Sequence, residues 1–370
     1  MNGTQTLRYG SWPSPITVDL AVGSSRGLSE PRQDGDDIYV LESRPDEAGR
    51  VTLLRRTPDG TFTEVAPELN VRTRVHEYGG GAYTATDGVA VFSEFDDNRL
   101  LLKSAPDEAI TELVTEPALR FADMSLDLAR DRVYAVMEDQ TESAIEARNL
   151  LVAVSLGDGS MTELAAGHDF YSDPVLSPDG SSLAFVTWDF PQMPWDGTDL
   201  WVAAIEADGT LGEPVHVAGG TEESVIQPKW APDGSLVYVS DRNDWWNLYR
   251  WREGASGSSE VDPMEAEVGG PQWVFGLSEY DIDADGTIYA FAHGPEGARL
   301  LALGSSEAPR EIGFAANGLT YVRVSDGTLT AIAGAFTKPS ALVRIDLASG
   351  VEERLREAST LGVDEAYLST

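Results

Sequence analysis

One short unit recurs seven times along the chain: a turn, usually Asp-Gly, followed at once by a strand of β-branched and aromatic residues. This order is the sequence signal of a β-hairpin. The aspartates of the turns are Asp34, Asp87, Asp131, Asp179, Asp233, Asp285 and Asp326, spaced 41 to 54 residues apart. Four strands and their turns need roughly 40 to 50 residues, the period of one propeller blade. The repeat therefore predicts an all-β chain, a seven-bladed β-propeller with four-stranded antiparallel blades.

Later strands follow at fixed places in most of these units. The expected third strands include 199–202, 247–250, 299–302 and 341–344. In such a ring each blade buries its faces against its two neighbours. The alternative, an irregular array of β-sandwiches, is disfavoured by the number and regularity of the turns. The best helix candidate is the short segment 142–151. The sequence leaves open whether the first and last segments share one blade or the ring stays open at that junction.

Charge and composition exclude several classes of partner. The chain has 62 acidic and 26 basic residues, a formal net charge of -36. This charge repels phosphate backbones and anionic lipid surfaces, so we expect neither nucleic acid nor a membrane as partner. The first 25 residues lack the layout of a secretory signal, and the absence of cysteine fits a reducing compartment. We therefore expect a cytoplasmic protein, with an acidity that suits either a high-salt habitat or a very soluble surface.

Metal motifs are incomplete. Asp281, Asp283, Asp285 and Gly286 fit the opening of an EF-hand loop, but its twelfth position is Ala292 where a glutamate belongs. Asp285-Gly286 is already explained as a blade turn. Neither an H-E-x-x-H motif nor a cysteine pair supports zinc. We expect no metal and no cofactor.

A serine in a G-x-S-x-G pattern also invites a catalytic interpretation. Residues 23–27 read GSSRG, with Ser25 in the nucleophile position. A nucleophile elbow needs a helix directly after the serine, whereas the polar stretch 28–37 contains Pro31 and leads into a strand. For the four histidines, His76, His168, His216 and His293, packed structural roles are favoured. No catalytic residue is assigned.

Three stretches look like more than generic propeller sequence. They are YGSWPSPIT at 9–17, RVHEYGGGAY at 74–83, and the pair MPWDGTDLWV at 193–202 and SDRNDWWNLYRW at 240–251. Together they resemble the propeller of bacterial acylaminoacyl-peptidase or dipeptidyl-aminopeptidase-like enzymes of the prolyl oligopeptidase family. The resemblance covers nearly the whole chain, and the motifs stand in the expected order.

The resemblance implies a division of labour. In that family an α/β-hydrolase domain follows the propeller and supplies the catalytic serine, aspartate and histidine, while the propeller covers the active site and excludes large folded substrates. It implies an N-terminal segment 1–20 that contacts the hydrolase, a propeller over 21–360, and the start of a connection to the hydrolase at 361–370. The expected function is a non-catalytic propeller that gates access and helps to select peptides for a serine exopeptidase.

The best candidate for peptide contact is the segment 72–81. It gathers Arg72, Arg74, His76, Glu77 and Tyr78 in front of three consecutive glycines. Glycines let a backbone bend sharply and approach a ligand closely. A carboxylate can hold a peptide amine, and an arginine can hold a carboxylate or a carbonyl oxygen. The alternative is that the glycines only shape a turn and the charges pair with each other.

A second candidate is the segment 241–246. It contains Asp241, Arg242, Trp245 and Trp246, which would line an interface to the hydrolase. The alternative is that the tryptophan pair packs between blades, as large aromatic side chains mostly do.

Two other functions compete with the peptidase propeller. One is a free-standing propeller that binds proteins or peptides on its top face. The other is a propeller hydrolase such as a sugar lactonase, which needs metal-binding acids and histidines around the channel. The small number of histidines argues against the lactonase.

Overall fold

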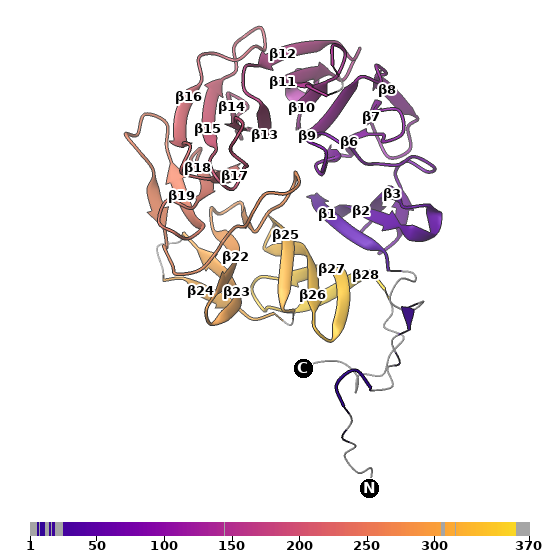
Figure 1. The fold of residues 1–370 in the computed structure, drawn as a ribbon, viewed down its shortest axis with the longest axis vertical. Coiled ribbons are helices and arrows are strands. Elements are labelled where there is room, and N and C mark those ends of the chain that lie inside the picture. Colours follow the sequence, from indigo (N-terminus) through magenta and orange to yellow (C-terminus); the bar gives the residue numbers. More distant parts are fainter. Residues whose placement is uncertain are drawn as a thin grey trace.

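The predicted seven-bladed β-propeller is confirmed. The structure is a computed structural model that describes residues 6, 8–11, 15, 17–18, 25–143, 145–304, 308–314 and 316–359. Seven four-stranded antiparallel sheets stand around a ring, and the strands of each sheet follow one another in sequence (Figure 1). Each blade is therefore a simple meander.

The strands of the first four blades have the following bounds. Blade 1 holds β1 (Gly27–Asp34), β2 (Asp37–Arg44), β3 (Arg50–Arg56) and β4 (Phe62–Glu64). Blade 2 holds β5 (Tyr83–Thr86), β6 (Val89–Ser93), β7 (Leu100–Lys103) and β8 (Ile110–Val114). Blade 3 holds β9 (Leu119–Asp127), β10 (Arg132–Asp139), β11 (Arg148–Ser155) and β12 (Met161–Ala165). Blade 4 holds β13 (Phe170–Leu176), β14 (Ser182–Trp188), β15 (Asp199–Ala204) and β16 (Val215–Gly219).

The remaining three blades complete the ring. Blade 5 holds β17 (Val225–Trp230), β18 (Leu236–Ser240), β19 (Asn247–Trp251) and β20 (Ser259–Val261). Blade 6 holds β21 (Tyr280–Ile282), β22 (Ile288–Gly294), β23 (Gly297–Leu303) and β24 (Arg310–Ile312). Blade 7 holds β25 (Gly318–Ser325), β26 (Thr328–Ala335), β27 (Lys338–Asp346) and β28 (Glu352–Glu357). The four predicted third strands all lie in third strands of blades.

The recurring turn joins the first and second strands in every blade. In blade 2, Asp87 and Gly88 have φ angles of 52° and 77°. Two consecutive positive φ angles define the type I′ turn that matches the twist of a hairpin, and Asp-Gly suits it. Asp34 also connects neighbouring blades, because its carboxylate accepts hydrogen bonds from the backbone N–H groups of Asp87, at 2.7 Å, and Gly88, at 2.8 Å.

The core is divided among the junctions between blades. Seven hydrophobic clusters lie in the described part of the chain, one at each junction, as expected when each blade buries both faces. Blades 1 and 7 meet through Leu28, Val40 and Leu54 on one side and Ile332 and Leu342 on the other. Within the residues that the structure describes, the two blades share no strand. The ring is therefore closed by packing of whole blades.

The predicted helix at 142–151 is wrong. Residues 148–151 begin strand β11, which pairs with β10 along its whole length. The run from Leu150 to Val154 is buried between blades on both faces, and such a continuous apolar run does not distinguish a buried strand from a helix by periodicity. The named helical elements are two three-residue 3-10 turns, η1 (Pro45–Glu47) and η2 (Leu128–Arg130). Within the described residues, no helix has the length and apolar character needed to cross a membrane.

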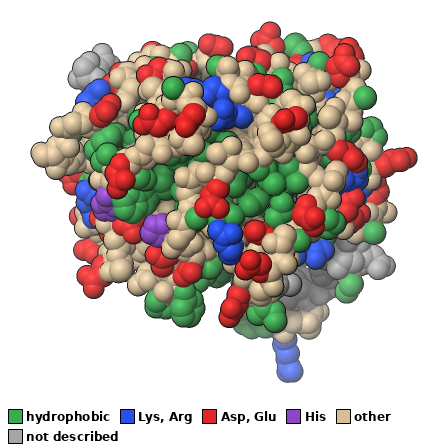
Figure 2. Space-filling model, turned by 90° about the horizontal axis from the view of Figure 1, so that it is seen from above, with side chains coloured by type: hydrophobic (Ala, Val, Ile, Leu, Met, Phe, Trp, Pro, Cys, Tyr) green, Lys and Arg blue, Asp and Glu red, His purple; other side chains and the backbone are tan. Residues whose placement is uncertain are grey.

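The domain bounds stay predictions at both ends. The strands run from Gly27 to Glu357, whereas most of segment 1–20 and all of 361–370 lie outside the described residues. Acidic side chains are scattered over the face shown in Figure 2 and do not gather in one patch.

Candidate functional site

Two loops that are distant in sequence meet near the centre of the ring (Figure 1). The blade 1–2 loop is 65–82, and the blade 5–6 loop is 262–279. The backbone N–H of Phe275 donates to the carbonyl oxygen of Gly79 at 3.0 Å, and Gly80 and Phe275 form a parallel bridge. Gly81 is held by the innermost strands, since its N–H donates to Glu30 and its carbonyl accepts from Asp123.

Two of the three consecutive glycines, Gly80 and Gly81, are required by this close approach. A Cβ atom on Gly80 would lie 2.5 Å from the carbonyl oxygen of Phe275, and one on Gly81 would lie 2.7 Å from the backbone nitrogen of Asp123. Both glycines have positive φ angles. The glycines therefore let two loops and an inner strand touch backbone to backbone, as close approach requires.

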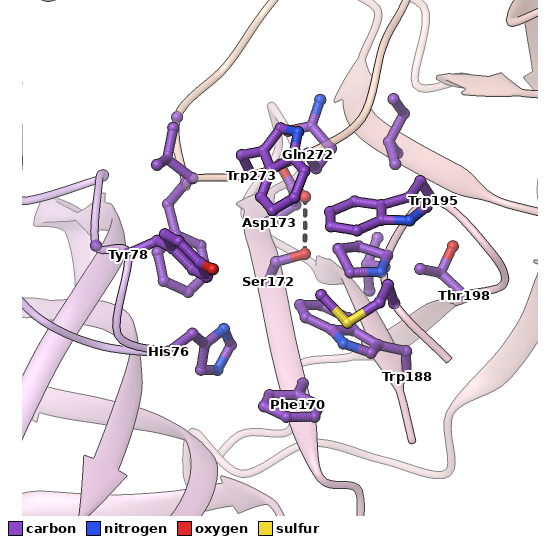
Figure 3. Close-up of a pocket in the computed structure, with 18 residues that line it drawn as sticks. His76, Tyr78, Phe170, Ser172, Asp173, Trp188, Trp195, Thr198, Gln272 and Trp273 are labelled. Carbon is purple, nitrogen blue, oxygen red and sulfur yellow. Dashed lines mark hydrogen bonds between the residues drawn. The ribbon is translucent and has the colours of Figure 1, made fainter. Parts of the chain in front are cut away.

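An aromatic pocket lies where these loops reach blade 4. It encloses about 850 Å³ of space, including its open mouth. Figure 3 shows Tyr78, Trp273 and Trp195 toward one end and His76 and Phe170 toward the other. Residues from four places line it: His76, Tyr78 and Gly79 of the blade 1–2 loop, Phe170, Ser172, Asp173, Val186, Trp188, Met193, Pro194, Trp195 and Thr198 of blade 4, Ile226 of blade 5, and 272–276 of the blade 5–6 loop.

His76 is packed among rings. Its imidazole lies edge-on to Phe170, with centroids 5.0 Å apart, and to Trp188, at 5.5 Å, and is tilted against Phe275, at 4.8 Å. Loss of hydration lowers the pKa of His76 to about 3, so the ring is neutral at physiological pH. Its Nε2 atom is buried and has no hydrogen-bond partner.

The mouth of the pocket is formed by exposed aromatic side chains. Trp273 lies 4.4 Å from Trp195 and 5.8 Å from Tyr78, measured between ring centroids. Tyr78 is 61% exposed and Trp273 is 52% exposed. Exposed aromatic residues around a concave surface are typical of binding sites.

Asp173 brings an acidic group to the same pocket. Its Oδ2 accepts a hydrogen bond from the Ser172 hydroxyl at 2.9 Å, drawn as a dashed line in Figure 3. Loss of hydration is the main reason that the pKa of Asp173 rises to about 7, and the nearby Asp123 carboxylate raises it further. This side chain is therefore only partly charged at neutral pH.

The structure divides the predicted segment 72–81. His76 and Tyr78 line the aromatic pocket, whereas Arg72 and Arg74 do not. Both guanidinium groups instead lie over the ring of Phe95, at 4.6 and 4.1 Å from its centroid. Glu77 is exposed and also does not line the pocket.

None of the residues predicted in 241–246 lines the aromatic pocket. Arg242 pairs with Glu223 at 2.6 Å and lies over the ring of Tyr249. Asp241 accepts a hydrogen bond from the backbone N–H of Ser224. Trp246 packs against the core between blades 5 and 6, and Trp245 is partly buried. For Trp246 the structure agrees with the alternative of packing between blades.

The residues of the G-x-S-x-G pattern and of the EF-hand-like pattern do not form the sites that these patterns suggest. Ser25 is exposed and is followed by strand β1, not by the helix of a nucleophile elbow. Asp281 pairs with Lys229 at 3.0 Å, and Asp285 lies in the turn of blade 6. Within the part of the chain that the structure describes, no group of three or more His, Cys, Asp or Glu side chains is placed to hold a metal ion.

Sequence reasoning missed most of the pocket's aromatic residues, namely Phe170, Trp188, Trp195, Trp273 and Phe275. Trp195 lies within the motif MPWDG, but the pattern of this motif does not distinguish the tryptophan as a site residue. The segment QWVFG at 272–276 offered a similar signal, since it is an aromatic cluster in a long loop between blades.

Comparison with solved structures finds close likenesses over the whole chain. A Mycobacterium tuberculosis puromycin-hydrolyzing peptidase is 34% identical, covers 99% of this chain and has a TM-score of 0.89. Puromycin hydrolase is 32% identical, covers 99% of this chain and has a TM-score of 0.88. This chain spans 59% and 58% of the lengths of these two proteins.

A more distant structure is similar in fold alone. The β-propeller domain of the Trilobed protease from Pyrococcus furiosus is 11% identical with a TM-score of 0.63, and the match covers 90% of this chain and 99% of that domain. No protein-family model and no curated protein sequence matches the chain.

Proposed function

Because this chain is a seven-bladed propeller that matches the propeller domain of prolyl oligopeptidase-family peptidases, we propose that it gates access to the active site of such a peptidase and helps to select its peptide substrates. The proposed enzyme is a serine exopeptidase that releases aminoacyl or acylaminoacyl groups. Its catalytic residues belong to an α/β-hydrolase partner domain, and its proposed location is the cytoplasm.

The aromatic pocket is the observation that carries this proposal. It lies where loops from two blade junctions reach blade 4, and its rim presents Tyr78 and Trp273 to solvent. Such a surface binds the apolar side chains of a peptide, since aromatic rings give large contact area at low entropic cost. A puromycin hydrolase S511A mutant, 32% identical to this chain, has been solved in complex with PGG, which supports a ligand-binding role for this family of structures.

The test is to sequence the source gene beyond the codon for Thr370 and to translate its reading frame. The proposal expects a glycine-flanked serine on a strand-turn-helix pattern, then an aspartate and a histidine, within roughly 270 residues. A natural stop codon directly after Thr370 would contradict it, and would favour a free-standing propeller that binds peptides through the same exposed aromatic rim.

A second assay separates gating from catalysis. The chain of 370 residues is incubated with aminoacyl and acylaminoacyl chromogenic substrates. No turnover is expected, because a strand and not the helix of a nucleophile elbow follows Ser25. Turnover that disappears in Ser25→Ala would assign catalysis to the propeller itself.

A further inference from the structure

The first strands of the blades share one irregularity. In five blades a β-bulge shifts the pairing between the first and second strands. At each bulge stands a residue with a positive φ angle of 51° to 58°: Glu30, Asp123, Asp173, Gln227 and Tyr321. Because the blades repeat around the ring, corresponding residues of their first strands lie at one height. Two positions beyond these bulge residues stand Arg32, Ser125, Val175, Lys229 and Arg323. The bulges therefore place three basic residues at one level.

A hollow runs along the axis of the ring at this level. The first strands face the centre of the ring (Figure 1), and residues from the first strand of every blade line the hollow. It encloses about 1150 Å³ of space, including its open mouth. We call it the central channel. The basic residues that line it are Arg32, Lys229 and Arg323.

Arg32 is half-buried in this channel and lacks an anionic partner. Within the part of the chain that the structure describes, it donates no hydrogen bond and forms no ion pair, and its guanidinium carbon lies 5.6 Å from the ring centroid of Tyr83. Its Nε atom is buried, whereas its two terminal nitrogens retain accessible surface. A ligand in the channel can therefore reach the terminal N–H groups of Arg32 directly.

Arg323 is the second basic residue without an acidic partner. It lies on β25 of blade 7, which contacts β1, the strand of Arg32. Its terminal nitrogens donate to the carbonyl oxygens of Val322, at 2.9 Å, and Gly276, at 3.2 Å, and each nitrogen carries a second N–H. Burial and then the positive charge of Arg32 lower the pKa of Arg323. The two guanidinium groups therefore repel each other, and carbonyl oxygens do not neutralise them.

The acidic groups around the channel leave this charge uncompensated. Lys229 already has a counter-charge, since its Nζ lies 3.0 Å from the carboxylate of Asp281. Burial raises the pKa of Asp123, and it raises the pKa values of Asp173 and Glu30 to about 7. These three carboxyl groups therefore carry less than their full charge near neutral pH. The cationic character of the site is local, in a chain that is acidic as a whole.

Two guanidinium groups on adjacent strands suit a compact oxyanion. The planar fork of a guanidinium matches the paired oxygens of a carboxylate or a phosphate. Charges that have lost part of their water are stabilised by a paired ion of opposite sign. One anion that contacts both Arg32 and Arg323 would supply that ion and would relieve their mutual repulsion.

We propose that the central channel binds a compact oxyanion, a carboxylate or a phosphate, between Arg32 and Arg323. The anion would connect the first and last blades, which share no strand among the described residues. The carboxylate would come from the C-terminus of a peptide, and the phosphate from solution. This inference goes beyond the proposed function, because it depends neither on the aromatic pocket nor on a hydrolase domain.

The test titrates the chain of 370 residues by calorimetry at pH 7. The probes are inorganic phosphate, triglycine, and triglycinamide, which lacks the free carboxylate. Sodium chloride keeps the ionic strength constant, because general attraction between exposed charges varies with salt. We expect saturable binding of phosphate, of triglycine or of both, and no binding of triglycinamide. Tighter binding of triglycine assigns the anion to a peptide terminus, and tighter binding of phosphate assigns it to the free ion.

Variants locate the bound anion. Arg32→Met and Arg323→Met should each weaken the binding at least about tenfold, as the loss of a charge-assisted hydrogen bond does. Arg32→Lys keeps the charge without the planar fork and should retain part of the affinity. Arg72→Met is the matched control, because Arg72 also lies over an aromatic ring, that of Phe95, but outside the channel. It should bind like the wild type.

The melting temperature of each variant shows whether it is folded. If a methionine variant does not fold, Arg32→Lys and Arg323→Lys take its place, and each should bind several-fold more weakly than the wild type.

Three results would overturn the proposal: no saturable binding of phosphate or triglycine, equal binding of triglycine and triglycinamide without binding of phosphate, or unchanged affinity in the folded variants of Arg32 and Arg323. Each of these results would leave the proposed peptidase role standing. A stop codon directly after Thr370 would remove that role and would leave anion binding to be judged by its own result.

Discussion

Arg356 in β28 of blade 7 donates a hydrogen bond from Nε to Oε2 of Glu42 in β2 of blade 1. Glu42 is fully buried, and its other oxygen accepts from Arg26 at 2.8 Å and from Arg44 at 3.0 Å. Three guanidinium groups thus surround one carboxylate at the junction between the first and last blades, which share no strand among the described residues. Among the described residues, the hydrophobic cluster at this junction is the smallest of the seven.

Glu42→Gln is expected to lower the free energy of unfolding by about 3 kcal/mol at pH 7, because it leaves three arginines without their shared counter-charge. Urea denaturation measures the change. The matched control is Glu353→Gln, since Glu353 forms an exposed pair with Arg344 and should contribute less than about 0.5 kcal/mol. Equal effects of the two substitutions would show that the Glu42 cluster does not stabilise the ring.

The same cluster has a pH signature. Burial raises the pKa of Glu42, but the hydrogen bonds from Arg356 and Arg44 outweigh it, and the net pKa lies below the ordinary value of 4.5. The stabilisation by Glu42 is therefore fully present above pH 4.5 and is lost as the pH falls below it. The difference between wild type and Glu42→Gln should shrink over that acidic range.

Glu30 should behave in the opposite way. Burial raises the pKa of its carboxyl from 4.5 to about 7, so the folded chain binds this proton more tightly than the unfolded chain does. The folded state is therefore penalised progressively as the pH rises from 4.5 through 7. Glu30→Gln should increase the free energy of unfolding at pH 8 by up to about 3 kcal/mol and by almost nothing at pH 4. A pH-independent difference in urea denaturation would refute this interpretation.

Gly80 is predicted to be far less replaceable than another glycine with the same backbone conformation. Gly80 and Gly286 have φ angles of 88° and 86°, but a Cβ on Gly80 would meet the Phe275 backbone, whereas the space around Gly286 is open within 4 Å. Gly286→Ala should cost about 1 kcal/mol from the φ angle alone. Gly80→Ala should cost at least about twice as much and should separate the two loops. Similar losses in thermal or urea denaturation would show that the loop contact is weak.

The architecture could be predicted because its signal is local. Each Asp-Gly turn and the strand after it form a hairpin from neighbouring residues, and the seven repeats then specify the number of blades. The prediction of a helix at 142–151 was wrong because the burial of this segment depends on non-local packing. Val152 and its neighbours are buried on both faces only after the neighbouring blades have packed, and no local pattern shows this.

Most of the pocket could not be predicted from the sequence, because it depends on contacts between distant segments. His76 and Tyr78 were among the candidates, since they stand before a glycine run. Trp195 and Trp273 are far from them in sequence. The bridge between Gly80 and Phe275 brings the loop of Trp273 beside them, and Trp195 lies in the loop between β14 and β15 of blade 4. The charged residues Arg72 and Arg74 looked more like ligands than the aromatic residues did, but the fold turns them onto Phe95.

We propose that this propeller binds the substrate of a peptidase and does not cleave it. The most direct measurement compares kcat and KM for a peptide p-nitroanilide between the wild type and Trp195→Ala, in the protein translated from the whole reading frame. We expect KM to rise about tenfold while kcat stays within about twofold, because the lost contact binds substrate and transition state alike. An unchanged KM, or a loss confined to kcat, would contradict it.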